Sequence, residues 1–436
     1  MSILSSTFSE FPHLIRNRGF VRIWLSQVFG QTATNLLHFA LVLRTFELTG
    51  SSFFVGVLVA VVSLPPILFG ALGGVIADRY DRRTILSVIN GSRVAVSLVL
   101  LPFLDLSGVI LVAVFLLTTL SEFFTPTEGA SIPALVPPDH LTGANALFAF
   151  TLYGSFLVGY TAAGPLLHFG GPLITLAAVA CLYAAAAVST IGLPHLRDHL
   201  MAPDGVLKRS VHSIRVQLME GLQFIRAHHL LPTLILEVSL LFGIERGVIA
   251  LIPAVALGYL GFTTFTVSLY FILPLALGTV MGALITNRLK RTARPLTLVH
   301  AGMWLEACAL LLVVPASMWL TRLVPAAPAM AVRVACTIAA ALCAGLGNVM
   351  VVVSTQTLIQ RETDDEKRGR VFGGLLTMMN LVGLPFILLL SHLGGSVPLT
   401  TLFTVLGLFL AAVAAVSATT VTVHWKRHPH PPDARL

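Results

Sequence analysis

The chain has 436 residues, of which 56% are hydrophobic and only 11% are charged, and its mean hydropathy is +0.90. Soluble globular proteins carry about 25% charged residues, so this composition excludes an ordinary soluble protein and predicts a chain embedded in a lipid bilayer. The net charge of +8 would suit a nucleic-acid partner, but most lysines and arginines lie in alternate loops between apolar runs. We therefore expect no nucleic-acid partner.

Twelve apolar runs, bounded by charged residues or by Gly and Pro, follow one another along the chain. They cover residues 20–47, 53–77, 84–104, 109–131, 143–168, 172–193, 230–257, 265–286, 296–320, 331–358, 371–392 and 398–423. A helix needs roughly 20 apolar residues to cross a bilayer, and each run reaches about that length. The sequence therefore predicts an all-α integral membrane protein with twelve transmembrane helices in two pseudo-symmetric six-helix bundles.

The basic residues predict the orientation of the chain in the membrane. They gather before the first run and in every second loop after it, for example at Arg82 and Arg83 and at Arg288 and Lys290. Loops that face the cytoplasm carry such an excess of Lys and Arg. We expect a multi-pass protein of the inner, cytoplasmic membrane with both termini in the cytoplasm.

The longest polar interval divides the apolar runs into two equal sets. We expect an N-terminal bundle over residues 1–193, a cytoplasmic linker over 194–229, a C-terminal bundle over 230–423 and a cytoplasmic tail over 424–436. Within the linker, apolar residues recur at helical spacing from Ile214 to Ile225, which predicts an amphipathic helix at the membrane surface. Two similar halves are typical of transporters that alternate access to a site between them.

Polar residues form one stripe on the first predicted helix. Its members are Gln27, Gln31, Asn35 and His38, which recur every three or four residues. A polar stripe on a membrane helix needs water or polar partners. We therefore take these four residues, with Arg246 and Asn348 on later helices, as candidates for a substrate cavity.

The end of the second run carries the most specific motif of the chain. Residues 70–83 are Gly-Ala-Leu-Gly-Gly-Val-Ile-Ala-Asp-Arg-Tyr-Asp-Arg-Arg. This motif resembles the signature of the major facilitator superfamily. The matching residues are Gly74, Asp78, Arg79, Arg82 and Arg83, and Asp81 stands where many members carry Gly. The resemblance implies the major facilitator fold.

The chemistry of this motif suits a conformational latch. Small glycines let two helices approach closely, and a carboxylate at a helix end can pair with arginines and with a neighbouring helix. We therefore expect such a latch at the six residues Gly74, Asp78, Arg79, Asp81, Arg82 and Arg83. The alternative is that the arginines only anchor the loop on the cytoplasmic side.

Shorter motifs resemble one branch of that superfamily, the enterobactin-exporter and macrolide-efflux-like carriers. They are Phe46–Ser51, Phe124–Pro126, Pro133–Val136, Ala144–Leu147 and Arg368–Val371. The resemblance implies proton-coupled export of a hydrophobic or amphipathic small molecule, such as a siderophore, a drug or another secondary metabolite. A lysophospholipid or other lipid-like substrate, then a metal ion, and last a non-transporting receptor or scaffold remain as alternatives.

Ionisable residues inside the apolar runs are costly in hydrocarbon and mark functional positions. They are Arg44, Arg93, Glu122, Glu128, Glu237, Glu245, Arg246, Glu306 and Arg333. The superfamily resemblance implies that the first, fourth, seventh and tenth helices line the central cavity. On these helices, Glu122, Glu237 and Glu245 are the candidates for proton coupling, because burial favours the protonated form of a carboxyl group.

Other roles are open for several of these residues. Glu122 and Glu237 would serve structure alone if each paired with an arginine such as Arg93. Arg44, Glu47 and Arg333 lie near the outer helix ends, where long side chains reach water or form a gate. For Arg93 and Glu306, on helices that are peripheral in this fold, we expect structural roles.

No common catalytic motif occurs in the sequence. The Gly-Lys-Ser/Thr of a phosphate-binding loop, His-Glu-x-x-His and Gly-x-Ser-x-Gly are all absent, and the histidines are spaced irregularly. We therefore expect no enzymatic activity, no cofactor and no metal site. The expected partners are a small-molecule substrate, protons and the lipid bilayer, and we expect the chain to act as a monomer.

Overall fold

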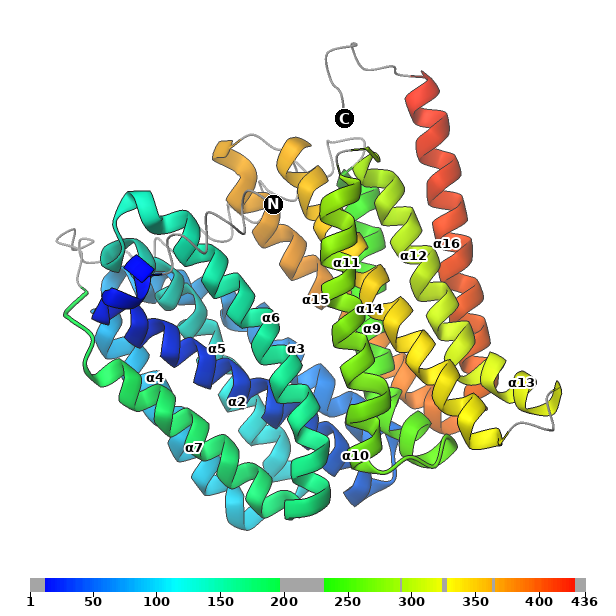
Figure 1. The fold of residues 1–436 in the computed structure, drawn as a ribbon, viewed down its shortest axis with the longest axis horizontal. Coiled ribbons are helices and arrows are strands. Elements are labelled where there is room, and N and C mark those ends of the chain that lie inside the picture. Colours follow the sequence, from blue (N-terminus) through cyan, green and yellow to red (C-terminus); the bar gives the residue numbers. More distant parts are fainter. Residues whose placement is uncertain (1–11, 197–230, 291, 324–327, 363–364, 428–436) are drawn as a thin grey trace. The chain divides into compact units, whose positions relative to one another are not determined.

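The structure is a computed structural model that describes residues 12–196, 231–290, 292–323, 328–362 and 365–427 (Figure 1). Within these ranges the secondary structure is helical, and no strand occurs. Residues 197–229 of the predicted linker, including its amphipathic helix, lie outside the described part. The same holds for residues 428–436 of the predicted tail.

The first of two compact units contains Met1–Gly50 and Val57–Gln217. Its long helices are α2 (Arg18–Thr49), α3 (Ser52–Arg79, whose first residues belong to the second unit), α4 (Arg82–Leu100), α5 (Ser107–Leu135), α6 (Leu141–Pro165) and α7 (Gly171–Ile191). Helix α2 packs against α6 and α7, and α4 packs against α5 and α7. Large apolar side chains, among them Phe20, Leu86, Phe124 and Phe148, form one buried cluster where α2, α4, α5 and α6 meet.

The second unit contains Ser51–Gly56 and Leu218–Leu436. Its described helices are α9 (Leu231–Pro253), α10 (Thr264–Val267), α11 (Leu273–Leu289), α12 (Pro295–Leu311), α13 (Ser317–Leu323), α14 (Ala329–Glu362), α15 (Asp365–Ser396) and α16 (Leu399–Arg427). Helix α9 packs against α15, and α14 packs against α11 and α12. Helix α12 also packs against α16, so α12 lies between two neighbours.

Each of the twelve predicted runs coincides with helix in the described residues, and the all-α fold is thereby confirmed. Four of the runs contain or run into a π-helical segment that the sequence analysis did not predict. These segments are η3 (Leu166–Gly170), η4 (Ala254–Tyr259), η5 (Ser268–Ile272) and η6 (Leu312–Ala316). The last contains Pro315, whose missing N–H interrupts the regular helical hydrogen bonds.

Ten stretches of the described residues are long and apolar enough to cross a membrane. One of them, Pro138–Ile191, contains both α6 and α7. Helix α2 is long enough, but its hydropathy falls short because the predicted polar stripe lies along it. The composition of α2 therefore distinguishes it from the other long helices.

Capping residues fix the ends of α2. The Asn17 side chain accepts hydrogen bonds from the backbone N–H groups of Gly19 and Phe20, at 3.0 and 3.1 Å. Its amide nitrogen donates to the carbonyl oxygen of Leu135 at the end of α5. At the other end, Gly50 takes a φ of 61°, a left-handed conformation that glycine adopts without strain.

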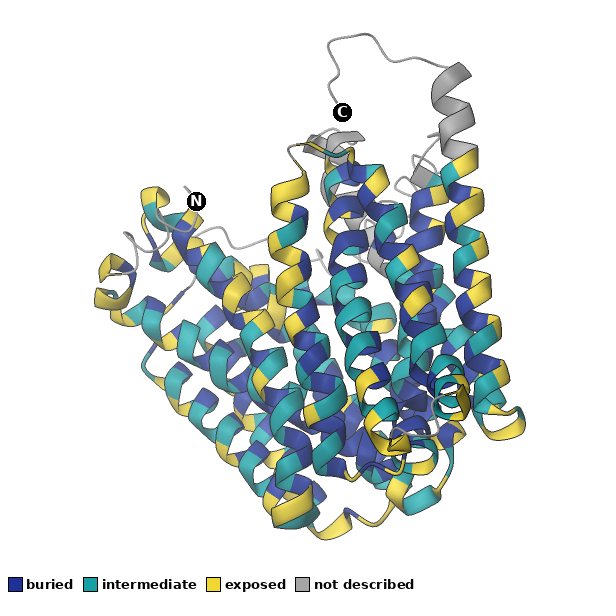
Figure 2. Ribbon diagram, turned by 45° about the vertical axis from the view of Figure 1, so that its right-hand side comes forward, coloured by how far each residue is buried: buried dark blue, intermediate teal, exposed yellow. Residues whose placement is uncertain are grey.

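Many helices carry buried residues on some faces and exposed residues on others (Figure 2). Phe150 and Phe169 are each 75% exposed, and Val188 is 69% exposed. Apolar surface on this scale would be unfavourable in water and suits contact with lipid tails.

Candidate functional site

The signature motif brings α3 close to α5 at Gly73. A Cβ atom at Gly73 would overlap the carbonyl oxygen of Glu122 and lie 2.8 Å from the ring of Pro126. At Gly74, the glycine that matches the superfamily signature, a Cβ atom would have no described atom within 4 Å. The close approach of the two helices therefore depends on Gly73.

Arg82 and Arg83 bind backbone carbonyl groups of neighbouring helices. Arg82 is only 8% exposed and donates a hydrogen bond of 3.0 Å to the carbonyl oxygen of Ala130 in α5. Arg83 donates one of 2.9 Å to the carbonyl oxygen of Ile191, the last residue of α7. The last carbonyl groups of a helix lack partners within the helix, so Arg83 satisfies a group that would otherwise need water. Asp78 and Arg79, at the end of α3, are exposed.

Asp81 occupies a turn that does not require glycine, because its φ is −59°. Its carboxylate accepts hydrogen bonds from the backbone N–H of Leu196 at 2.9 Å and from the Thr84 hydroxyl at 3.0 Å, and it lies 3.2 Å from Nδ1 of His195. Burial alone would raise the pKa of Asp81, but these hydrogen bonds outweigh it and hold the pKa below its usual value. The carboxylate thus binds the segment that follows α7.

The polar stripe of α2 lies partly against α6. Gln27 is buried, and its amide nitrogen donates a hydrogen bond of 3.4 Å to the carbonyl oxygen of Phe148. A Cβ atom at Gly159 would lie 2.7 Å from Cβ of Asn35, so α2 and α6 are in close contact there. Gln31 and His38 are half-buried. The role of the stripe stays a prediction.

Arg93 lies at the centre of a buried polar network in the first unit. It is 3% exposed and donates hydrogen bonds to the side chains of Asn90 at 3.3 Å and Ser121 at 2.9 Å. Its guanidinium carbon lies 4.5 Å from the centre of the Phe124 ring. The acidic group that acts on Arg93 electrostatically is Glu128 of α5, which is 5% exposed.

Glu122 differs from Glu128 in its surroundings. It is half-buried, and its Oε2 atom lies 3.4 Å from the position that a Cβ atom would take on Gly70. Oε1 of Glu128 is buried and has no hydrogen-bond partner among the described residues. The alternative in which Arg93 pairs with Glu122 therefore finds no support in the described contacts, since Glu128 is the acidic neighbour of Arg93.

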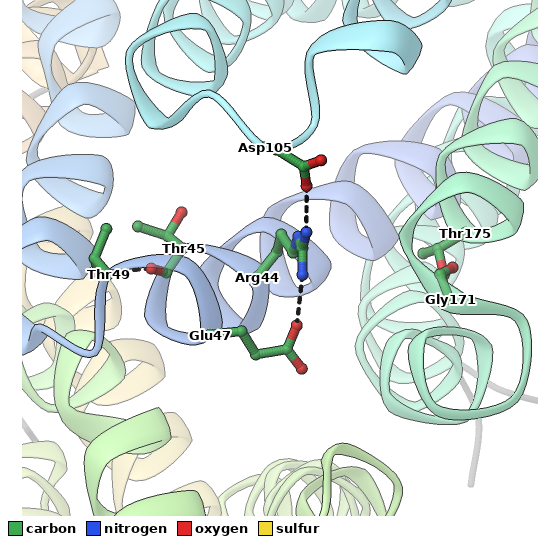
Figure 3. A network of polar contacts seen from close by, with 7 residues as sticks. All are labelled: Arg44, Thr45, Glu47, Thr49, Asp105, Gly171 and Thr175. Atoms are coloured by element: carbon green, nitrogen blue, oxygen red, sulfur yellow. Dashed lines mark hydrogen bonds and ion pairs between the residues drawn. The ribbon is translucent and has the colours of Figure 1, made fainter.

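At the predicted outer end of α2, Arg44 lies between two carboxylates (Figure 3). It forms ion pairs with Glu47, at 3.3 Å, and with Asp105, which follows α4. The carboxylate of Asp105 is 80% exposed. Both ion pairs join residues of the first unit.

In the second unit, Glu237 of α9 contacts α16. The carboxylate accepts a hydrogen bond from the hydroxyl of Ser417 in α16. The same hydroxyl lies 2.8 Å from Nε2 of His300 in α12. Oε2 of Glu237 is buried and has no hydrogen-bond partner among the described residues. Carboxyl, hydroxyl and imidazole groups thus form a continuous polar chain.

Two of the sequence-predicted site residues lie in direct contact. The amide nitrogen of Asn348 in α14 donates a hydrogen bond to Oε1 of Glu245 in α9. The carboxyl group of Glu306 in α12 and the positive charge of Arg246 both lie near Glu245. The guanidinium carbon of Arg246 lies 4.8 Å from the centre of the Phe242 ring.

The sequence analysis did not foresee three members of these contacts. His300 and Ser417 were not singled out, and Glu306 was expected to be structural. His300 and Glu306 are six residues apart on α12, so they lie on different faces and reach different helices. Only the charge of Glu306 within an apolar run marked it in the sequence. Among the described residues, no group of three or more His, Cys, Asp or Glu is arranged to hold a metal ion.

The family profile and similar curated proteins indicate the same family. The sequence profile of the Major Facilitator Superfamily matches residues 23–386. Macrolide efflux protein A of Streptococcus pyogenes is 24% identical over 381 residues, which cover 86% of this chain and 88% of that protein. Enterobactin exporter EntS of Shigella boydii serotype 4 is 27% identical over 376 residues, which cover 84% of this chain and 82% of the exporter.

A solved structure has the same fold. The crystal structure of the POT family transporter PepTSo aligns with a TM-score of 0.71 and 12% sequence identity, and it covers 95% of this chain and 99% of that one. At this identity the likeness shows the fold alone. The family match, which spans most of the chain, confirms the resemblance found in the sequence. The chain therefore belongs to the Major Facilitator Superfamily and is a multi-pass membrane transporter of small molecules rather than an enzyme.

Proposed function

We propose that the chain is a secondary active transporter that exports a hydrophobic or amphipathic small molecule in exchange for protons by alternating access. The names of two relatives, macrolide efflux protein A and enterobactin exporter EntS, support export of such a molecule. The positive-inside pattern supports a place in the cytoplasmic membrane with both termini in the cytoplasm.

The observation that carries the coupling proposal is the set of carboxyl groups inside apolar helices. Glu237 is 6% exposed, and Glu245 lies beside Asn348 and Glu306 of its own unit. A buried carboxylate is costly in an apolar medium, whereas the protonated form is far less so. A change of surroundings during transport would therefore bind or release a proton. Glu122, Glu237 and Glu245 are the coupling residues that we propose.

The remaining site residues have two proposed roles. Gln27, Gln31, Asn35, His38, Arg246 and Asn348 would supply polar contacts to the substrate, while the apolar helix surfaces around them take up its hydrophobic part. Asp78 and Arg79 would form the switching part of the latch, since they are exposed at the end of α3. Arg82 and Arg83 would hold this latch in place through their contacts with α5 and α7.

Transport into proteoliposomes tests the proposal. Liposomes with an acidic interior, containing the purified protein, are given a radiolabelled macrolide from outside. Because a basic macrolide also accumulates in acidic liposomes without any carrier, protein-free liposomes with the same gradient are the essential control. We expect several-fold higher accumulation with the protein and its loss when an ionophore dissipates the gradient.

Equal accumulation with and without the protein would contradict macrolide transport. Parallel samples with a labelled siderophore and a labelled lysophospholipid then identify the cargo. If the protein carries one of them without any effect of the pH gradient, proton coupling is wrong and export by another driving force remains.

A further inference from the structure

Two carboxyl groups lie close to one another inside the second unit. They belong to Glu245 of α9 and Glu306 of α12. Two ionised carboxylates this close in an apolar interior would repel each other, so the pair is stable only when one of them is protonated and donates a hydrogen bond to the other. The Glu245–Glu306 pair therefore holds at least one proton.

The surrounding groups decide which residue holds that proton. Glu245 accepts a hydrogen bond from the amide of Asn348 and lies near the positive charge of Arg246. Both favour an ionised Glu245. Glu306 is 6% exposed, and its Oε1 atom has no hydrogen-bond partner among the described residues. The lack of a partner costs much less free energy for the carbonyl oxygen of a protonated carboxyl group than for the charged oxygen of a carboxylate.

The packing of α12 against α14 holds Glu306 in this position. A Cβ atom at Gly302 would lie 2.6 Å from the carbonyl oxygen of Gly347. A Cβ atom at Gly347 would lie 2.6 Å from the carbonyl oxygen of Gly302 and 3.0 Å from Cγ of Glu306. Glycine at both positions brings the two helices together and leaves space for the Glu306 side chain beside Asn348.

We infer that Glu306 is a permanently protonated carboxylic acid that donates a hydrogen bond to ionised Glu245, so that the transported proton binds at Glu245. This inference rests on the proposed proton-coupled transport. Glu306 is then a positioning residue rather than a proton carrier. When a proton binds to the Glu245 carboxylate, the pair holds two protons, its charge changes from minus one to zero, and the charge of Arg246 loses its partner.

Infrared spectroscopy of the purified protein tests the protonation of Glu306 without any substrate. At neutral pH, the wild type should show the carbonyl stretch of a protonated carboxylic acid, shifted in deuterium oxide. Glu306→Gln should remove a part of this band, whereas Glu245→Gln should leave it and change only its frequency. Asp139→Asn, at an exposed position, is the control and should leave the band unchanged. An unchanged band in Glu306→Gln would overturn the inference.

Transport tests the positioning role. The amide of Gln donates a hydrogen bond as a protonated Glu does, so Glu306→Gln should retain most of the pH-gradient-driven transport. Glu306→Leu has no donor and should lose most of it, and Glu245→Gln should lose it entirely. A Glu306→Gln variant that folds and binds substrate but no longer responds to the gradient would overturn the inference, because Glu306 itself would then carry the proton.

The two readouts separate this inference from the proposed function. If the wild type moves no compound in response to a pH gradient, the proposed coupling is wrong, and with it the role of Glu245 as carrier. The infrared difference between wild type and Glu306→Gln still decides whether Glu306 holds a proton. Thermal unfolding of each variant identifies any that fail to fold, and Glu306→Gln, which preserves shape, is the variant least disturbed.

Discussion

Gly73 of α3 lies directly against the backbone carbonyl group of Glu122 in α5. The end of the helix that carries the signature motif is therefore packed on the helical turn that carries one of the proposed coupling residues. A movement of α3 relative to α5 would change the surroundings of Glu122. This contact gives a physical connection between the proposed latch and Glu122.

The first prediction compares two adjacent glycines. Gly73→Ala places a methyl group against the Glu122 carbonyl and the Pro126 ring. The methyl group of Gly74→Ala has no described neighbours. Overpacking of this kind costs about 1–3 kcal/mol. We expect a lower thermal unfolding temperature for Gly73→Ala in detergent and little change for Gly74→Ala. Equal effects of the two substitutions would show that the close approach at Gly73 is not important for stability.

The second prediction concerns the pH dependence of the Asp81 contact. Hydrogen bonds lower the pKa of Asp81 in the folded protein, so its stabilising contribution is present above the unfolded value of about 4 and is lost as pH falls through the folded value. Asp81→Asn should therefore be less stable than the wild type at neutral pH, by about 1 kcal/mol. The difference should shrink below about pH 4, as measured by thermal unfolding across a pH series. A difference independent of pH would contradict a role for the charge.

The third prediction concerns the buried Arg93 network. Arg93→Met removes the positive charge that acts on Glu128 and the hydrogen bonds to Asn90 and Ser121. A buried hydrogen-bonding group left without its partner costs about 1–3 kcal/mol, so this variant should unfold at a lower temperature. Adding Glu128→Gln to it should restore part of the stability, because no unpaired charge then remains. If the double variant is no more stable than Arg93→Met, the two residues are not energetically coupled.

The fourth prediction concerns the latch. Asp78→Asn removes a charge at the exposed end of α3 but keeps the shape of the side chain. Transport should fall sharply while membrane insertion and substrate binding persist, measured by flux assays beside equilibrium binding. Asp139→Asn, an exposed acid elsewhere in the first unit, is the matched control. Full transport by Asp78→Asn would contradict the latch and favour the alternative that the motif only anchors the loop on the cytoplasmic side.

The sequence alone predicts the helices well, because apolar runs of this length have only one favourable structure in a membrane. It also singled out Glu245 and Asn348, which the structure brings into contact although 103 residues separate them. It did not predict the role of Gly73, because both Gly73 and Gly74 suit a close helix approach and only the packing against α5 distinguishes them.

Other features depend on contacts between helices that are far apart in the sequence. The proximity of Glu128 to Arg93, of Ser417 to both Glu237 and His300, and of Glu306 to Glu245 follows from how the helices are rotated about their axes. Hydropathy fixes which segments are helices but only weakly fixes that rotation. Asp81 illustrates a further limit, since its partners Leu196 and His195 become adjacent only after α7 has folded beside α4.

The central claim is that a proton bound at Glu245 drives export, and one pair of flux measurements tests it most directly. Inside-out vesicles containing wild type or Glu245→Gln are compared for macrolide uptake driven by a pH gradient and for exchange of labelled against unlabelled macrolide at equal pH. Our account predicts that Glu245→Gln loses gradient-driven uptake, since Gln mimics the permanently protonated state, and keeps exchange at equal pH. Gradient-driven accumulation by Glu245→Gln at the wild-type level would contradict it.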